Sequence, residues 1–210
     1  GRALAAGQDM RKTLAMVATF RETDNETPIV LMGYYNPIYA YGPEKFAADA
    51  GKAGVDGLIV VDLPPEEEAE LRDPAAAADI DMVRLIAPTT TDARIGELVQ
   101  NASGFVYYVS VRGITGTSSA AAGDIASNVG RIQQQTDLPV AVGFGIRTPD
   151  QAADVARVAD AAVVGTAIVE QIAGALADDG TPAPDLVART LDYVSRLSSA
   201  VRAARDGAAA

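Results

Sequence analysis

The sequence reads Leu138-Pro139-Val140-Ala141-Val142-Gly143-Phe144-Gly145-Ile146 where an apolar strand candidate runs directly into a glycine turn. Two other strand candidates end in the same way, one before residues 110–117 and one before Gly165-Thr166. Glycine in such a turn lets the backbone approach an anion and points successive N–H groups at it. In an α/β barrel the loops after the last strands commonly bind phosphate in this manner. The pattern therefore predicts a parallel α/β fold with a phosphate site at the carboxyl ends of its late strands.

Short apolar segments recur along the whole chain, and each is followed by a helical segment. They are near-continuous runs of Val, Ile and Leu, which is typical of parallel strands buried on both faces. The strand candidates are Pro28–Gly33, Gly57–Asp62, Met82–Ala87, Gly104–Ser110, Leu138–Gly143 and Ala161–Gly165. The helix candidates between and after them include Pro43–Ala53, Pro65–Ala78, Asp92–Asn101, Pro149–Val158 and Pro184–Arg205.

The repeating βα pattern predicts a single domain over residues 1–210 without a linker. A complete (β/α)₈ barrel has eight strands and about 250 residues, whereas this chain offers six strand candidates. The chain also begins inside an amphipathic helix with no preceding strand, and the apolar face of that helix is Leu4, Met10, Leu14, Val17 and Phe20. We therefore predict a partial TIM (β/α)₈ barrel of about six βα units that lacks the first two. An open six-stranded sheet is the alternative.

Composition excludes several classes of function. The net charge of −11, without any basic run, argues against binding to nucleic acid. No segment has the uncharged apolar length of a membrane helix, and no secretory signal precedes the first helix, so we expect a cytoplasmic protein. The absence of Cys and His removes disulfides, thiolate chemistry and the commonest metal ligands. We therefore expect no metal site, and acid–base chemistry must use carboxylates or Tyr.

The predicted phosphate site is neutral. We expect backbone N–H groups of Gly116, Gly145, Gly165 and Thr166 to bind the anion, because only Arg112 and Arg147 are basic residues close to these turns. The alternative is that the glycines only permit tight turns. A dinucleotide fingerprint is disfavoured, since no third glycine follows Gly143-Phe144-Gly145 at the required offset.

Asp62 is the best general-base candidate that spacing offers, because it ends a strand at the presumed mouth of the barrel. The alternative is structural: because a helix begins soon after Asp62, its side chain would fix the turn by accepting backbone hydrogen bonds. Glu66, Glu67 and Glu68 lie in the first turn of that helix, and we expect them to form a solvated face.

Tyrosines cluster near the ends of two strand candidates and would form flat walls for a flat apolar group. Tyr35, Tyr39 and Tyr41 are expected to pack loops. Because side chains alternate along a strand, only one of Tyr107 and Tyr108 can face the interior of the barrel.

The chain resembles the tryptophan synthase alpha subunit family over essentially its whole length. Five motifs carry the resemblance in the same order and at matching spacing. They are Leu31–Pro37 (Leu-Met-Gly-Tyr-Tyr-Asn-Pro), Val61–Glu67 (Val-Asp-Leu-Pro-Pro-Glu-Glu), Tyr107–Ser110 with Gly113–Gly116, Gly143–Ile146 and Val164–Val169.

The resemblance implies a TIM barrel that cleaves indole-3-glycerol phosphate by a retro-aldol step into indole and glyceraldehyde 3-phosphate, in L-tryptophan biosynthesis. It implies an α2β2 heterotetramer in which the β subunit carries pyridoxal phosphate, whereas the α subunit has no cofactor. A carboxylic acid with a raised pKa can supply the proton that this reaction needs, so the absence of His is compatible with it.

The resemblance also implies a role for each matching position. Phosphate would contact Gly116, Gly145, Gly165 and Thr166, where the family usually has Ser in place of Thr166. The residues 112–123 would form a loop that closes over substrate, with Arg112 at a position often held by a small residue. The indole and glycerol parts would lie among Met32, Tyr34, Ile59, Val61, Leu85, Tyr107, Thr115 and Phe144, and the residues Asn36, Pro37 and Pro64 would face the β subunit.

The family's catalytic Glu and Asp belong to the stretch that would precede Gly1, so the resemblance implies no catalytic residue in this chain. We therefore expect the chain by itself to be inactive and expect Asp62 to shape the site near the subunit interface. Two alternatives remain: another phosphate-binding barrel enzyme of aromatic amino-acid biosynthesis, and a fragment that binds ligand without catalysis.

Overall fold

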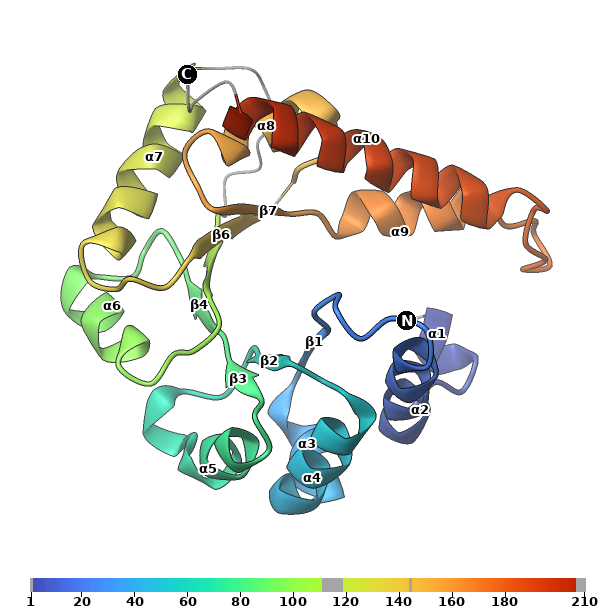
Figure 1. Ribbon diagram of the computed structural model, residues 1–210, viewed down its shortest axis with the longest axis horizontal. Coiled ribbons are helices and arrows are strands. Elements are labelled where there is room, and N and C mark those ends of the chain that lie inside the picture. The colour runs from blue at the N-terminus through green and yellow to red at the C-terminus, as the bar shows by residue number, and fades with distance from the viewer. Residues whose placement is uncertain (1, 111–118, 144, 207–210) are drawn as a thin grey trace. The chain divides into compact units, whose positions relative to one another are not determined.

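The computed structural model describes residues 2–110, 119–143 and 145–206 (Figure 1). These residues form an α/β fold with two parallel sheets, which confirms the predicted fold class at this level. The chain divides into two compact units. The first comprises Gly1–Leu85 with Glu97–Gly104, and the second comprises Ile86–Gly96 with Phe105–Ala210.

The first unit contains a three-stranded sheet in the order β1-β2-β3. β1 (Val30–Gly33) pairs with β2 (Gly57–Val60), and β2 pairs with β3 (Asp81–Met82), all in parallel. Helices α4 (Pro43–Ala53) and α5 (Ala69–Ala77) lie along one face of this sheet (Figure 1). The other elements before β3 are α1 (Arg2–Ala5), α2 (Met10–Arg21), α3 (Tyr35–Tyr41) and the short 3₁₀ helix η1 (Pro65–Glu67).

The core of this unit lies between the sheet and its helices. Phe46 from α4 and Leu71 from α5 pack in one buried cluster with Leu58, Val60 and Met82 from the strands. Burial of each such side chain contributes about 1.5–3 kcal/mol. The cluster therefore fixes which face of β2 is turned toward the helices.

The second sheet has the order β4-β5-β6-β7. Its strands are β4 (Arg84–Ile86), β5 (Val106–Val109), β6 (Val140–Gly143) and β7 (Ala161–Val163). The long helix α10 (Leu186–Asp206) packs against α8 (Pro149–Ala156) and α9 (Thr166–Ala173), as Figure 1 shows. The remaining helices are α6 (Asp92–Val99) and α7 (Ser119–Gln133).

Five of the strand candidates each contain one observed strand, although the observed strands are shorter. The prediction of a single strand over Met82–Ala87 is wrong. β3 continues the ladder of β2, and the N–H of Val83 still donates to Leu58 at 2.9 Å, whereas β4 belongs to the second sheet. The chain therefore changes sheets at Val83, which a run of apolar residues does not reveal.

The predicted continuous helix at the N-terminus is also wrong, because the segment forms α1 and α2 with a turn between them. Gly7 adopts a φ of +82°, and the Asp9 side chain accepts a hydrogen bond from the N–H of Lys12 to begin α2. Leu14 and Val17 are buried as expected. Leu4 is 72% exposed, so the expected apolar face does not extend across the turn.

Glu68 is fully buried, so the prediction that it belongs to a solvated face is wrong. Its carboxylate forms an ion pair with Arg84, whose exposed fraction is 4%, and a second one with Arg72 at 3.2 Å. Burial lowers the pKa of the Arg84 guanidinium. The pair joins Glu68, just before α5, to Arg84, the first residue of β4. Because both side chains are buried, loss of either partner would leave the other charge without a partner or solvent.

We predict that Arg84→Met lowers the free energy of unfolding by about 3–5 kcal/mol, because it leaves the buried Glu68 carboxylate without its main partner. The double variant Arg84→Met with Glu68→Met should recover most of this loss, since no charge then remains buried. Urea unfolding monitored by circular dichroism measures both values. As a control, Arg157→Met removes an exposed pair with Asp154 and should cost at most about 1 kcal/mol. Equal losses in Arg84→Met and Arg157→Met would contradict the role of the buried pair.

Candidate functional site

In the first unit, four of the predicted substrate-contacting residues share one face of the sheet. The register pairs Met32 with Ile59, while Leu58 and Val60 point to the opposite face and pack on the helices. Tyr34 and Val61 continue the same alternation, and the N–H of Val61 still donates to Gly33 at 3.0 Å. Met32 is 60% and Tyr34 64% exposed. Apolar and aromatic side chains thus line this face at the carboxyl ends of β1 and β2, and a flat apolar group would fit against them.

Leu85 and the predicted partner-facing residues also belong to the first unit. Leu85 is half-buried on β4, directly after the buried Arg84. Asn36 and Pro37 lie in the first turn of α3, and Pro64 lies just before η1. These three residues are exposed.

Asp62 connects the turns that follow β1 and β2. Its Oδ1 accepts a hydrogen bond from the N–H of Tyr35 at 2.7 Å, and the Tyr35 hydroxyl donates to Glu70 at 2.9 Å. Asp62 follows β2, which ends at Val60, and is exposed. Of the two roles that the sequence left open for Asp62, these contacts favour the one that fixes the turn.

Burial, followed by the hydrogen bond to Glu70, raises the pKa of Tyr35 from 10.0 to about 12. The fold favours the neutral phenol, so Tyr35 stabilises the protein fully below its ordinary pKa and loses that contribution as the pH rises from 10.0 to about 12. We predict that the advantage of the wild type over Tyr35→Phe in thermal unfolding disappears across this interval. Glu70→Gln should bring the loss to lower pH, because it removes the acceptor carboxylate. If the difference in melting temperature between the wild type and Tyr35→Phe stays constant from pH 10.0 to about 12, this prediction is wrong.

In the second unit, Tyr107 and Tyr108 point to opposite faces of β5, as predicted. Tyr108 is buried, whereas Tyr107 is half-buried and lies across Gly143 of β6. A Cβ added at Gly143 would lie 2.5 Å from the Tyr107 hydroxyl oxygen and 2.8 Å from the Val163 Cβ. Glycine at this position therefore makes room for the Tyr107 ring at the carboxyl end of β6.

We predict that Gly143→Ala destabilises the protein by about 1–3 kcal/mol, because the new methyl group must displace the Tyr107 ring or spread two strands. The matched control is Gly130→Ala inside α7, where an added Cβ meets nothing within 4 Å. That change should stabilise the helix by up to about 1 kcal/mol. Urea unfolding and the near-ultraviolet circular dichroism of tyrosine measure the two effects. An unchanged tyrosine signal in Gly143→Ala would contradict the close packing.

The second unit also contains the described residues of the predicted phosphate site. Gly145 follows β6 with a φ of +79°, a backbone conformation that favours glycine, and it is exposed. Gly165 precedes α9 as its N-cap, and Thr166 is the first residue of that helix. An added Cβ at Gly165 would meet nothing within 4 Å. The first N–H groups of a helix have no partner within the helix, so this end of α9 offers donors to an anion.

Gly116, Thr115 and Phe144, together with Arg112, lie outside the described residues. Their predicted roles therefore remain predictions.

Sequence reasoning missed the contacts made by Arg147. Its guanidinium forms an ion pair with Glu170 of α9, and its carbonyl accepts a hydrogen bond from the Tyr193 hydroxyl of α10 at 2.6 Å. Nothing in the local sequence signals these contacts, since the partners of Arg147 are 23 and 46 positions away.

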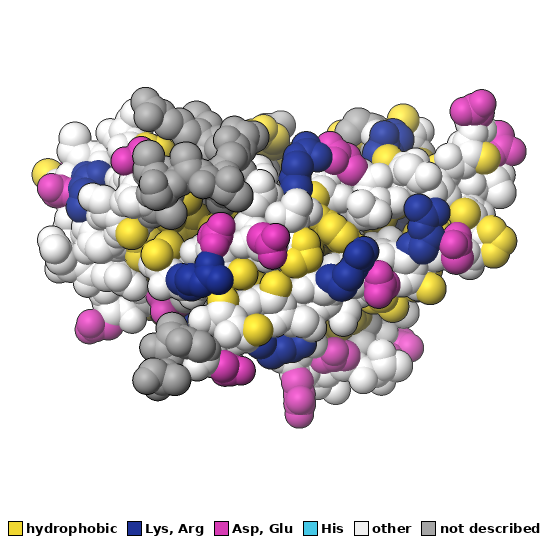
Figure 2. Space-filling model, turned by 90° about the horizontal axis from the view of Figure 1, so that it is seen from above, with side chains coloured by type: hydrophobic (Ala, Val, Ile, Leu, Met, Phe, Trp, Pro, Cys, Tyr) yellow, Lys and Arg dark blue, Asp and Glu magenta, His cyan; other side chains and the backbone are white. Residues whose placement is uncertain are grey.

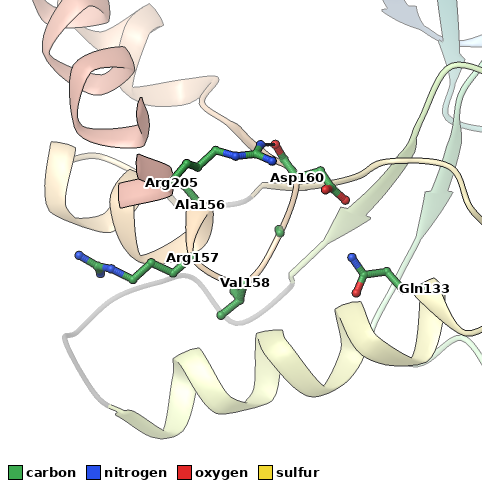
Figure 3. Close-up of a pocket in the computed structure, with 7 residues that line it drawn as sticks. Gln133, Ala156, Arg157, Val158, Asp160 and Arg205 are labelled. Carbon is green, nitrogen blue, oxygen red and sulfur yellow. Dashed lines mark hydrogen bonds between the residues drawn. The ribbon is translucent and has the colours of Figure 1, made fainter. Parts of the chain in front are cut away.

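A polar hollow of about 370 Å³ lies elsewhere in the second unit. Figure 3 shows Arg205 reaching toward Asp160 and Arg157 pointing away from it. Asp160 immediately precedes β7, and its carboxylate accepts a hydrogen bond from the N–H of Val140, the first residue of β6. The hollow is therefore at the amino ends of these strands, opposite to their glycine turns, and it contains none of the predicted site residues.

Acidic side chains outnumber basic ones in this chain, whose net charge is −11. Figure 2 shows basic and acidic side chains beside one another with apolar side chains between them on the face that it displays. The described part of the chain contains no group of three or more acidic residues that could hold a metal ion. Among the described helices, none is both long and apolar enough to span a bilayer.

Parallel strands alternating with helices place the chain in the α/β class of folds, to which TIM barrels belong. The family model described as "Tryptophan synthase alpha chain" matches residues 1–196. The chain belongs to the tryptophan synthase alpha chain family, which confirms the resemblance seen in the sequence motifs. The members of this family are carbon–carbon lyases of tryptophan biosynthesis.

Individual relatives agree with this assignment. The tryptophan synthase alpha chain of Gluconacetobacter diazotrophicus is 55% identical over 204 residues, which are 97% of this chain and 74% of the relative. A crystal structure of the Legionella pneumophila alpha chain superposes with a TM-score of 0.82 at 38% identity, covering 96% of this chain and 72% of that one. A chain from a structure of the Pyrococcus furiosus tryptophan synthase α2β2 complex superposes with a TM-score of 0.81 at 34% identity, covering 94% and 77%.

Proposed function

We propose that this chain binds indole-3-glycerol phosphate at the carboxyl ends of its strands and serves its retro-aldol cleavage to indole and glyceraldehyde 3-phosphate. Membership of the family supports the reaction. The observation that carries the binding proposal is the amino end of α9, where the N-cap Gly165 leaves open space and supplies no side chain to cap the first helical N–H groups. A substrate phosphate is the anion that this end suits.

The phosphate would be held mainly by main-chain groups. Gly145 and Gly165 allow the backbone to approach the anion, and Thr166 adds a hydroxyl. We propose Gly116 as the fourth contact on the strength of the sequence motif. Because Arg147 is paired with Glu170, the described part of this site binds phosphate with neutral donors.

The apolar part of the substrate would lie against the aromatic and aliphatic face described above. On the strength of the resemblance, we propose that Met32, Tyr34, Ile59, Val61 and Leu85 contact this part of the substrate, and we propose the same role for Tyr107 by its motif. We include Thr115 and Phe144 among the substrate contacts on the strength of the sequence motifs alone.

The reaction requires a proton at indole C3 and the removal of a proton from the glycerol hydroxyl. The resemblance assigns neither task to a residue of this chain, so we propose no catalytic residue here. We assign neither task to Asp62, because its carboxylate is engaged with the N–H of Tyr35.

We propose that residues 1–210 form one domain equivalent to the third to eighth βα units of a TIM barrel. The share of the relatives that this chain covers, 74% and 73% of two tryptophan synthase alpha chains, supports this correspondence.

We also propose a β subunit as the partner. The structure of the Pyrococcus furiosus protein is described as a tryptophan synthase α2β2 complex. Asn36, Pro37 and Pro64 form the surface that we assign to this contact, and the Asp62 to Tyr35 hydrogen bond would hold the turns that carry them. We expect the cytoplasm as the location and pyridoxal phosphate only in the partner.

Calorimetric titration with glycerol 3-phosphate tests the binding proposal. We predict that the wild-type chain binds this ligand and that Gly165→Val weakens binding by about tenfold or more, a loss of about 1.4 kcal/mol or more, because its side chain occupies the space meant for the phosphate. The surroundings of Gly165 are open, but its φ of −116° and ψ of −81° lie outside the regular helix and strand regions; urea unfolding therefore measures the effect of Val on stability separately from its effect on binding.

Gly130→Ala is the matched control, since Gly130 is equally open but lies within α7, and it should bind like the wild type. Equal affinity of Gly165→Val and the wild type would refute a phosphate site at α9. Absence of binding by the wild type would refute the proposed function of this chain as it stands.

A further inference from the structure

We propose that Arg147, Glu170 and Tyr193 form a positioning cluster that holds the Gly145 turn and the amino end of α9 in fixed relation, and thereby sets the affinity for phosphate. This inference deepens the proposed function and rests on it. Arg147 and Glu170 lie in or beside the two turns, whereas Tyr193 comes from α10. None of the three is assigned a contact with the substrate.

Arg147 is bound through all of its polar parts, each by a different helix. Its guanidinium donates to Glu170 of α9 through two contacts, Nη1 to Oε2 at 2.5 Å and Nη2 to Oε1 at 3.2 Å. Its backbone N–H donates to the Gln151 side chain of α8 at 2.8 Å. Its carbonyl accepts from the hydroxyl of Tyr193, a buried residue of α10. Three helices therefore fix the backbone two positions after Gly145.

Glu170 transmits this restraint to α9. It lies four residues after Thr166, so it stands one turn along the same side of the helix. A two-point contact between a guanidinium and a carboxylate fixes orientation as well as distance. The ion pair therefore couples the direction of the first N–H groups of α9 to the position of the Gly145 turn.

The ion pair also decides where the charge of Arg147 points. The hydrogen bond between them raises the pKa of Arg147 and lowers the pKa of Glu170, so both remain ionised at neutral pH. With its carboxylate bound to the guanidinium, Glu170 keeps the only described arginine beside these turns directed toward α9. An exposed pair of this kind adds little to the stability of the fold. If it served stability alone, its removal would leave the affinity for phosphate unchanged.

Titration with glycerol 3-phosphate tests this cluster. Glu170→Gln and Tyr193→Phe should each weaken binding by about three- to tenfold, a range found for residues that act through their neighbours. The reversed pair, Arg147→Glu with Glu170→Arg, should bind within about twofold of the wild type, because it restores the contact and keeps both backbone hydrogen bonds of residue 147. Asp154→Asn is the matched control, since it breaks a similarly exposed pair with Arg157 on α8 and should bind normally.

Unchanged or tighter binding by Glu170→Gln would overturn the inference, and tighter binding would show that Glu170 withholds a useful cation from phosphate. Amide hydrogen exchange without ligand gives a second and independent measurement. Glu170→Gln should accelerate exchange at Gly145 and Ile146 although the substitution lies on α9, and the reversed pair should restore it. If exchange in the Gly145 turn stays unchanged, the coupling between this turn and α9 is refuted. This result does not depend on ligand binding, so it can be read even if the wild type binds no ligand and the proposed function has failed.

Discussion

The parallel backbone ladder is the constraint on which the candidate site depends. Within each sheet, hydrogen bonds keep neighbouring strands in register, so the turns that follow them emerge at the same edge. The pairings of Gly33 with Val60, and of Val109, Gly143 and Val163 in the second sheet, place the carboxyl ends side by side. Residues far apart in the chain thereby meet at one edge of a sheet. The residues of the candidate site therefore need not be evenly spaced along the sequence.

The three glycines of the second unit that concern the site serve different purposes. Gly143 leaves room for the Tyr107 ring, Gly145 adopts a left-handed backbone, and Gly165 keeps open space before a helix. In the sequence all three belong to one pattern, in which glycine lies at or just after the end of a strand candidate. The distinction matters chemically, since the first shapes the apolar face and the other two concern the approach of an anion.

Two ion pairs illustrate how burial changes the meaning of the same chemistry. Glu68 and Arg84 are enclosed in the core, where loss of one partner leaves a charge without solvent. Arg147 and Glu170 are about half exposed, so water and salt weaken their effect on stability. The Glu68–Arg84 pair therefore affects the stability of the fold, whereas we assign to the Arg147–Glu170 pair the alignment of two turns.

The sequence by itself determined the parallel βα architecture, the bounds of α4, the family and the opposite orientation of Tyr107 and Tyr108, because these depend on local periodicity, capping residues and short motifs. Only the tertiary structure decided that the chain changes sheets at Val83, that Glu68 is buried against Arg84, that Asp62 binds the N–H of Tyr35, and that Arg147 joins three helices. These features arise from contacts between residues far apart in the chain. Such contacts form only when the strands have paired, and no pattern within a single segment records them.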